Sequence, residues 1–191
     1  LNQLRVSCDR TTAPAHVSGV QSDEIAHPRP YCEISRQLST FHPECAFLPR
    51  KCKVAVIASE KTVRAAIQVH DIGLQMVCND AGDLGFRVHV CGGLGRTPMV
   101  GPVIRDFLPE ADLLTYLEAV LRVYNRYGRR DNKFKARIKI LVKALTPEVF
   151  AEKVEAEWSH IKDSPSRLTR EAIDRIQAYF TEPDYQTVDN A

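Results

Sequence analysis

The sequence lacks several features that identify common classes of protein. No apolar run reaches the roughly 20 residues that a membrane-spanning helix needs, and no basic segment followed by an apolar one opens the chain like a signal peptide. Its six cysteines include no C-x-x-C pair, so their spacing predicts neither a zinc nor an iron–sulfur site within the chain. These absences favour a cytoplasmic protein with reduced cysteines, no metal ligands and no membrane partner.

Motifs for nucleotide binding and serine hydrolysis are absent as well. The glycine-rich loop at residues 92–95 matches neither G-x-G-x-x-G nor a P-loop, and Gly-x-Ser-x-Gly does not occur. The pair His70 and Asp71 resembles a metal-binding dipeptide, but the other five histidines have no spacing that completes such a site. We therefore predict a structural role for this pair.

The charges are balanced overall but unevenly placed. The chain has 26 Lys and Arg against 24 Asp and Glu, a net charge of +2. Residues 121–143 carry nine bases and one acid, whereas residues 144–191 carry five bases and ten acids. Such a basic band needs an acidic partner, which could be solvent counterions, the acidic helices of residues 148–174, a nucleic acid or a polycarboxylate ligand.

Hydrophobic periodicity, proline and glycine positions predict an α+β fold with a mixed β-sheet, helices packed on it and a helical C-terminal part. We expect strands over residues 51–58, 72–79 and 85–91, the last two forming a hairpin, and helices over 22–38, 59–69, 110–127, 132–144, 147–160 and 169–180. As domains we expect an irregular segment at 1–21 with a possible first strand, one α+β domain at 22–145, and a helical extension of it at 146–191. The chain begins with Leu and is expected to be part of a longer protein.

Two features suggest binding of an anion. On a strand, Lys51 and Lys53 share one face with their side chains about 7 Å apart, which fits either a solvated strand end or an anion site. On a helix from residue 132, Lys133 and Arg137 share a face. Gly92 and Gly93 follow a strand, where glycines allow close approach of the backbone to a ligand or to another segment.

The order of these motifs resembles the sirohaem- and 4Fe–4S-dependent sulfite and nitrite reductases, and among them the haemoprotein subunit of assimilatory sulfite reductase. The resemblance extends from about residue 24 to 180. It rests on LPRKCKV (48–54), HDIG (70–73), GFRV (85–88), GGLGRTPM (92–99), FLP (107–109), YNRYGRRDNK (124–133) and RIK (137–139).

The resemblance implies a fragment of a reductase that converts sulfite to sulfide by six electrons, with nitrite reduction to ammonia as the alternative. In that family, this region is the first of two sirohaem-binding domains. The 4Fe–4S cluster is bound by cysteines beyond this chain, and electrons come from ferredoxin or an NADPH-dependent flavoprotein. The isolated chain is therefore expected to be inactive, and no nucleic-acid partner is expected.

The resemblance also implies roles for individual residues. Lys51 and Lys53 would contact the substrate, and Arg137 would pair with a sirohaem carboxylate. The basic residues Arg130 and Lys133 would face the same polycarboxylate cofactor. The backbone at Gly92 and Gly93 would lie close to the macrocycle.

Three cysteines depart from the family pattern. Cys52 stands where the family has an aromatic residue, Cys91 where it has a glycine, and Cys8 where it has a catalytic arginine. Two other interpretations remain open from the residues alone. One is a domain that keeps the fold without activity, and the other is a non-catalytic module that binds nucleic acid or an acidic partner through residues 122–143.

Overall fold

A computed structural model describes residues 10–14, 23–59 and 66–181 of the chain. None of the helices in these three stretches is long and apolar enough to cross a membrane. Cys8 lies outside the described residues. So do residues 60–65, which make up most of the helix predicted at 59–69.

A five-stranded mixed sheet forms the centre of the molecule. Its strands are β1 (Arg10–Pro14), β2 (Cys52–Ile57), β3 (Ile72–Cys78), β4 (Leu84–Val90) and β5 (Val103–Pro109), and they lie side by side in this order. Strands β1, β2 and β3 run parallel to one another, whereas β4 is antiparallel to both β3 and β5. The predicted α+β fold with a mixed sheet and a helical C-terminal part is confirmed.

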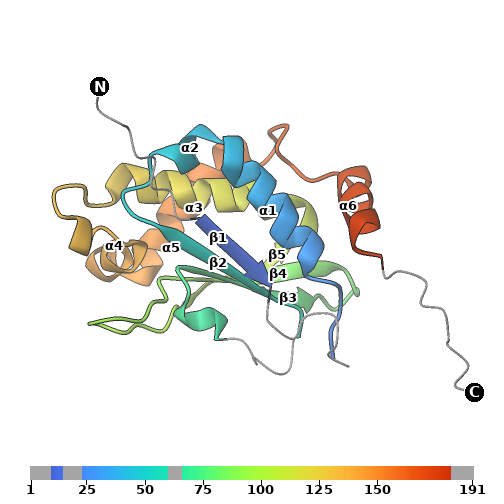
Figure 1. Cartoon of the computed structure of the whole chain (residues 1–191), viewed down its shortest axis with the longest axis horizontal. Coiled ribbons are helices and arrows are strands. Elements are labelled where there is room, and N and C mark those ends of the chain that lie inside the picture. The colour runs from blue at the N-terminus through green and yellow to red at the C-terminus, as the bar shows by residue number, and fades with distance from the viewer. Residues whose placement is uncertain (1–9, 15–22, 60–65, 182–191) are drawn as a thin grey trace, which may run out of the picture.

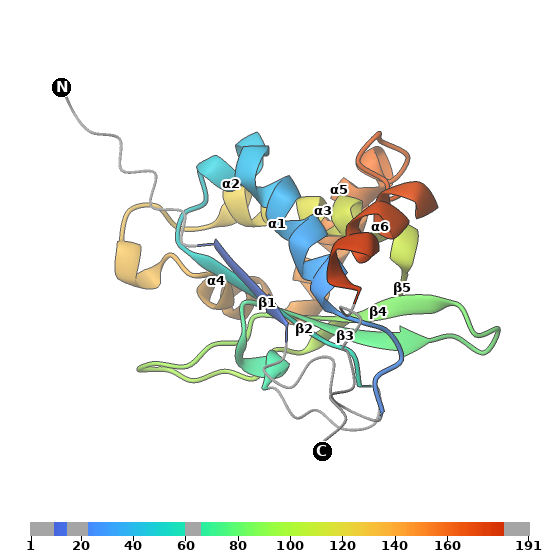
Figure 2. The same cartoon turned by 45° about the vertical axis from the view of Figure 1, so that its right-hand side comes forward.

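The helices cover one face of this sheet (Figures 1 and 2). They are α1 (Arg29–Phe41), α2 (Pro43–Ala46), α3 (Leu113–Tyr127), α4 (Ile138–Leu145), α5 (Pro147–Ile161) and α6 (Arg170–Gln177). Short 3₁₀ turns lie at η1 (Ile67–Val69), η2 (Glu110–Asp112), η3 (Lys133–Lys135) and η4 (Ala178–Phe180). In both views η1 lies on the other side of the sheet from the helices.

Strand alternation separates two hydrophobic clusters. On β2, Cys52, Val54 and Val56 face the helices and belong to the main core, together with residues of β3, β4 and α3. The alternate residues Ala55 and Ile57 form a small cluster with Ile67 of η1 on the other face. Lys53 therefore lies on the face of the sheet that the helices leave uncovered.

Two predicted helices differ from the structure, and one strand was missed. The helix expected at 22–38 begins only at Arg29, because Pro28 is its N-cap and Pro30 fits the first turn. The helix expected at 132–144 is interrupted, with η3 followed by extended backbone at Arg137 before α4 begins. Strand β5 was not predicted at all.

Strand β5 cannot be recognised from the sequence pattern, for a physical reason. Arg105 and Asp106 break its apolar alternation, and the strand lies at the edge of the sheet with irregular register against β4. The guanidinium of Arg105 turns towards α5 and pairs with Glu155 at 2.8 Å. A strand of this kind shows no clear alternation of apolar and polar residues.

The expected domain boundaries, after residue 21 and after residue 145, stay a prediction.

Candidate functional site

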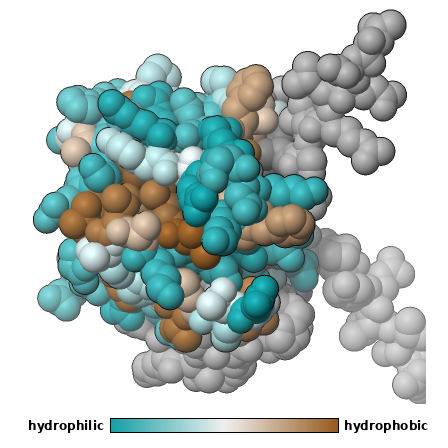
Figure 3. All heavy atoms as spheres, turned by 90° about the vertical axis from the view of Figure 1, so that its left-hand side faces the viewer, coloured by the Kyte–Doolittle hydropathy of each residue, from teal (hydrophilic) through white to brown (hydrophobic). Residues whose placement is uncertain are grey.

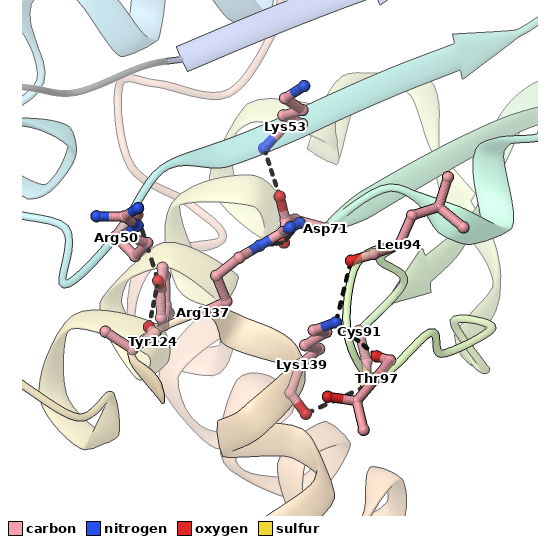
Figure 4. A network of polar contacts seen from close by, with 10 residues as sticks. Arg50, Lys53, Asp71, Cys91, Leu94, Thr97, Tyr124, Arg137 and Lys139 are labelled. Carbon is pink, nitrogen blue, oxygen red and sulfur yellow. Dashed lines mark hydrogen bonds and ion pairs between the residues drawn. The ribbon is translucent and has the colours of Figure 1, made fainter. Parts of the chain in front are cut away.

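The candidate site lies where β2, β3, the glycine-rich loop and α4 meet (Figure 4). Its central residue is Asp71, directly before β3, whose side chain is fully buried. The Asp71 Oδ2 accepts a hydrogen bond of 3.0 Å from the backbone N–H of Lys53. Its Oδ1 accepts from the guanidinium of Arg137, from Nε at 3.0 Å and from Nη2 at 2.5 Å.

Arg137 reaches this carboxylate from the start of α4. Arg137 is the N-cap of α4, and its backbone is extended, with φ −69° and ψ 150°. It therefore does not lie within a helix, although the sequence predicts one over residues 132–144. As a result, Lys133 and Arg137 do not share a helix face. Arg137 was expected to pair with a cofactor carboxylate, and within the chain its guanidinium already pairs with Asp71.

The two lysines occupy different positions relative to β2. Lys53 is an exposed residue of the strand, whereas Lys51 comes one residue before the strand begins. Strand alternation therefore determines on which face of the sheet Lys53 lies, but it does not determine the face of Lys51. In Figure 4 the Lys53 side chain extends away from Asp71, and only its backbone N–H is directed at the carboxylate. Neither ammonium group has an ion-pair partner among the described residues.

Gly92 and Gly93 are glycines for different reasons. A Cβ on Gly92 would lie 2.3 Å from the carbonyl oxygens of Gln68 and His70, so this residue packs against the backbone of the same chain. A Cβ on Gly93 would meet Lys139 Cδ at 3.1 Å and Arg137 Nη2 at 3.4 Å. Gly93 is therefore the glycine that lies beside the cationic side chains.

Lys139 holds the glycine-rich loop in place. It is buried, with 6% of its surface exposed, and its ammonium donates to the carbonyls of Thr97 at 2.7 Å and Leu94 at 3.3 Å. Both carbonyls belong to the loop between β4 and β5, whose Gly93 and Met99 also pair with each other. A buried ammonium bound to carbonyl oxygens leaves a net positive charge at this position.

Cys91 connects this loop to β4. Its φ of +89° lies in the left-handed region that favours glycine, which gives a physical reason for a glycine at this position. Burial raises the pKa of the Cys91 thiol to about 11, with the charge of Asp71 adding to the rise and that of Lys139 opposing it. The thiol is therefore protonated at neutral pH and does not act as a thiolate.

Tyr124 of α3 joins the segment before β2 to the segment before α4. Its hydroxyl donates to the carbonyl of Ala136 at 2.7 Å and lies 3.3 Å from the carbonyl of Arg50. Burial is the main cause of a raised pKa of this phenol. The residues next to Lys51 and Arg137 are thus held against one buried side chain (Figure 4).

Arg130 and Lys133 lie apart from this cluster. Both are exposed; Arg130 donates to the carbonyl and side-chain oxygens of Asn125. The Lys133 ammonium lies 5.4 Å from the ring centroid of Phe134, which is itself 80% exposed. Nothing among the described contacts brings either cation to Asp71 or Gly93.

An apolar groove borders the site on the side with α4. It has a volume of about 380 Å³ and lies between the glycine-rich loop and the helices α4 and α5, lined by Cys91, Met99, Val100, Pro102, Val142, Lys143, Thr146 and Pro147. Figure 3 looks onto the left-hand side of Figure 1, where apolar side chains gather on the surface.

Two residues of the site were not predicted from the sequence. Asp71 was assigned a structural role, and Lys139 received no role of its own. A sequence signal for Lys139 was present, because this lysine follows Arg137 by two residues and stands among the apolar residues of α4. No sequence signal links Asp71 to Arg137, because they lie 66 residues apart.

Comparison with known proteins identifies the family. A family model described as "Nitrite and sulphite reductase 4Fe-4S domain" matches residues 6–162. The chain is 32% identical over 151 residues to sulfite reductase (ferredoxin) 1 of Mycolicibacterium paratuberculosis, covering 79% of this chain and 27% of that protein. It is 34% identical over 116 residues to the sulfite reductase (NADPH) hemoprotein beta-component of Leptospira biflexa, covering 57% and 20%.

A solved structure agrees with these relatives. The NirA protein of Mycobacterium tuberculosis superposes with a TM-score of 0.70 at 27% sequence identity, covering 78% of this chain and 27% of that one. The chain thus spans about a quarter of the length of these proteins. Since the family model extends over most of its residues, the chain belongs to the nitrite and sulphite reductase 4Fe-4S domain family.

Proposed function

We propose that this chain is the sirohaem-binding part of a sulfite reductase that reduces sulfite to sulfide. The observation that carries the proposal is that Asp71 binds both the backbone of Lys53 and the guanidinium of Arg137, which brings the segment with the two lysines next to Arg137. Lys51 and Lys53 supply ammonium groups, and Arg137 supplies guanidinium hydrogens that Asp71 does not use. We prefer sulfite to nitrite because the relatives named above are sulfite reductases.

The donor set suits sirohaem, a polycarboxylate tetrapyrrole. Arg137 would hold one of its carboxylates, with Gly93 leaving room for the ring edge, because the absent Cβ would otherwise occupy the space beside Arg137 and Lys139. Arg130 and Lys133 are proposed as more distant cofactor contacts, and Gly92 as a residue that fixes the loop. When bound, sirohaem would supply the iron that takes the substrate and the path for electrons.

The 4Fe–4S cluster does not suit the described part of this chain. No group of three or more His, Cys, Asp or Glu side chains is placed there to hold a metal ion. Cys32 and Cys91 are buried in the core, and Cys78 is exposed at the end of β3. We therefore propose that the cluster ligands belong to other parts of the longer protein.

Lys51 and Lys53 would act on the substrate. Sulfite is an oxyanion, and its reduction consumes protons as each oxygen leaves as water. Fixed ammonium groups stabilise negative charge on the bound oxyanion and can pass protons to it. Electrons would come from ferredoxin or from an NADPH-dependent flavoprotein, and relatives of both kinds match the chain. A cytoplasmic location is part of the same proposal.

The test uses the longer protein that contains this chain. Replacing Lys53→Gln should lower sulfite turnover by about 10²–10³-fold, the usual effect of losing one fixed donor to an oxyanion. Sirohaem content, measured from its absorbance, should stay at the wild-type level. Lys162→Gln, at an exposed position after α5, is the matched control. Wild-type protein without sirohaem would refute the proposal, and faster turnover of nitrite than of sulfite would replace its substrate.

A further inference from the structure

We infer that Asp71 is a positioning residue of this site. Its buried carboxylate holds the guanidinium of Arg137 and the backbone at Lys53, so that the unused hydrogens of Arg137 face an external anionic group. This inference deepens the function proposed above and rests on it for the identity of that group. It assigns a site role to a residue for which the sequence indicates only a structural one.

One residue joins three segments that are distant in the sequence. The Asp71 carboxylate binds Lys53 of β2 through Oδ2 and Arg137 before α4 through Oδ1. The Asp71 carbonyl accepts a hydrogen bond of 3.0 Å from the N–H of Cys91, at the start of the glycine-rich loop. The segments that carry Lys53, Arg137 and the glycine-rich loop are thus each fixed to Asp71 directly.

The hydrogen bonds of Arg137 leave part of its guanidinium available. The group has five N–H donors, and Asp71 takes the one on Nε and one on Nη2. Within the part of the chain that the structure describes, the remaining three have no acceptor, and 23% of the side-chain surface is exposed. The planar fork is rigid, so fixing one edge also fixes the direction of the other.

Because Asp71 is negatively charged, it cannot itself attract an anionic ligand. A carboxylate beside Arg137 weakens the attraction of an incoming anion. Any benefit to anion binding must therefore come from holding the guanidinium in one orientation before the ligand arrives, which lowers the entropy cost of binding. These two effects have opposite signs, and an experiment can separate them.

The first measurement compares binding of uroporphyrin, a tetrapyrrole octacarboxylate, to the full 191-residue chain and its variants. Asp71→Asn removes one negative charge with almost no change in shape, so electrostatics alone predicts tighter binding. We expect binding about tenfold weaker, which corresponds to about 1.4 kcal/mol. Asp112→Asn is the matched control, since Asp112 is also buried and pairs with Arg167 at 2.8 Å; this variant should bind as the wild type does. Unchanged or tighter binding by Asp71→Asn overturns the inference.

The second measurement observes Arg137 directly. In wild-type protein the Nε–H of Arg137 should give a slowly exchanging ¹⁵N NMR signal, which Asp71→Asn weakens and Asp71→Ala abolishes. The Nε–H of Arg122, bonded to Glu118 at 3.0 Å, is the internal reference and should persist. An Arg137 signal that is equally protected in all variants shows that Asp71 does not position it.

The two measurements also separate this inference from the proposed function. If wild-type protein does not bind uroporphyrin, the sirohaem proposal loses support, and the NMR result decides the role of Asp71. If wild-type protein binds and the Asp71 variants bind equally well, the sirohaem proposal stands and the positioning role is wrong.

Discussion

The backbone at Cys91 carries strain that its side chain does not relieve. Its φ of +89° belongs to the left-handed region, and it is one of two residues other than glycine with positive φ in the described chain. The Cβ of a residue in this conformation crowds the following carbonyl and costs about 1–2 kcal/mol. A glycine here would remove the strain, at the cost of a more flexible unfolded state.

We expect Cys91→Gly to be more stable than Cys91→Ala by about 0.5–1 kcal/mol. Both variants remove the thiol, so their difference reports the backbone strain less the greater flexibility that glycine gives the unfolded state. Urea denaturation of the two proteins measures it. The same pair of substitutions at Cys78, an exposed strand residue, should show the opposite order, because glycine weakens a regular strand. If the glycine variant is less stable than the alanine variant at both positions, the backbone at Cys91 is unstrained.

His89 gives the molecule a sensitivity to acid. It is buried on β4, its Nδ1 lies 3.2 Å from the carbonyl of Gly101, and its Nε2 is buried without a partner. Burial is the main cause of its lowered pKa. The folded state therefore holds the neutral imidazole at a pH where the unfolded state already binds a proton.

This difference fixes the sign of the pH dependence. The contribution of the neutral His89 imidazole to the free energy of unfolding is complete above about pH 6.5, the ordinary histidine pKa. It is lost as the pH falls towards the lower pKa of the folded state. We expect the free energy of unfolding of wild-type protein to fall more steeply between pH 6.5 and 5 than that of His89→Gln. His160→Gln, at an exposed position, should keep the wild-type slope. Parallel slopes for wild type and His89→Gln would contradict the assignment.

At the scale of elements, the glycine-rich loop depends on α4 for its conformation. Its own pairing consists of two hydrogen bonds between Gly93 and Met99, of 3.0 and 2.9 Å. Lys139 adds two charge-assisted bonds from the helix. The ends of the loop are also held, by the bonds from Cys91 N–H to the Asp71 carbonyl and from Gly101 N–H to the Gln68 carbonyl. Since charge-assisted bonds contribute about 1.5–3 kcal/mol each, we infer that Lys139 orders the part of the loop between these ends.

Replacing Lys139→Met should therefore loosen the loop while keeping its apolar stem. We expect amide hydrogen exchange of Gly93 and Met99 to accelerate by about 10–100-fold, and exchange in β3 to stay unchanged. Lys143→Met, an exposed lysine of the same helix, is the control. Equal protection of the loop in both variants would mean that Lys139 does not hold it.

At the scale of the molecule, the basic band is partly neutralised within the chain. Arg122 pairs with Glu118 and Glu157, Arg129 with Asp131, and Arg137 with Asp71. Lys139 is buried against carbonyl oxygens. Five cations of the band remain exposed without a carboxylate partner among the described residues: Arg126, Arg130, Lys133, Lys135 and Lys143. They are spread over the end of α3, the segment that contains η3, and α4, with at most three on one segment, whereas a nucleic-acid site usually presents a continuous basic surface.

We accordingly expect weak, non-specific binding to nucleic acid. Retention of duplex DNA should vanish at physiological ionic strength, about 0.15 M, and the slope of log affinity against log salt should correspond to only two or three phosphate contacts, roughly −2 to −3. Fluorescence anisotropy with labelled DNA measures both. Uroporphyrin binding, which also depends on packing, should persist at this ionic strength. Tight DNA binding with a steep slope would support the rival hypothesis of a nucleic-acid module.

Local patterns in the sequence determine much of the fold. The alternation around Val54 and Leu74 predicts two central strands, and the turn at 80–83 predicts their hairpin partner. Pro147 and Thr169 mark the starts of α5 and α6, where the Thr169 side chain accepts from the N–H of Ala172. The order of the motifs resembles the family that the comparisons show. The signals for strands, turns and helix starts lie within about ten residues of each position, where helix and strand periods operate.

Only the tertiary structure decided how the site is built. The carboxylate of Asp71 and the guanidinium of Arg137 meet across 66 residues of sequence, and this pairing accompanies extended backbone at a position where the local pattern predicts helix. Strand β5 and the burial of Lys139 likewise depend on contacts with distant segments. The physical reason is that a buried charge must be compensated by whatever group the fold brings to it. Residue spacing along the chain does not specify that group.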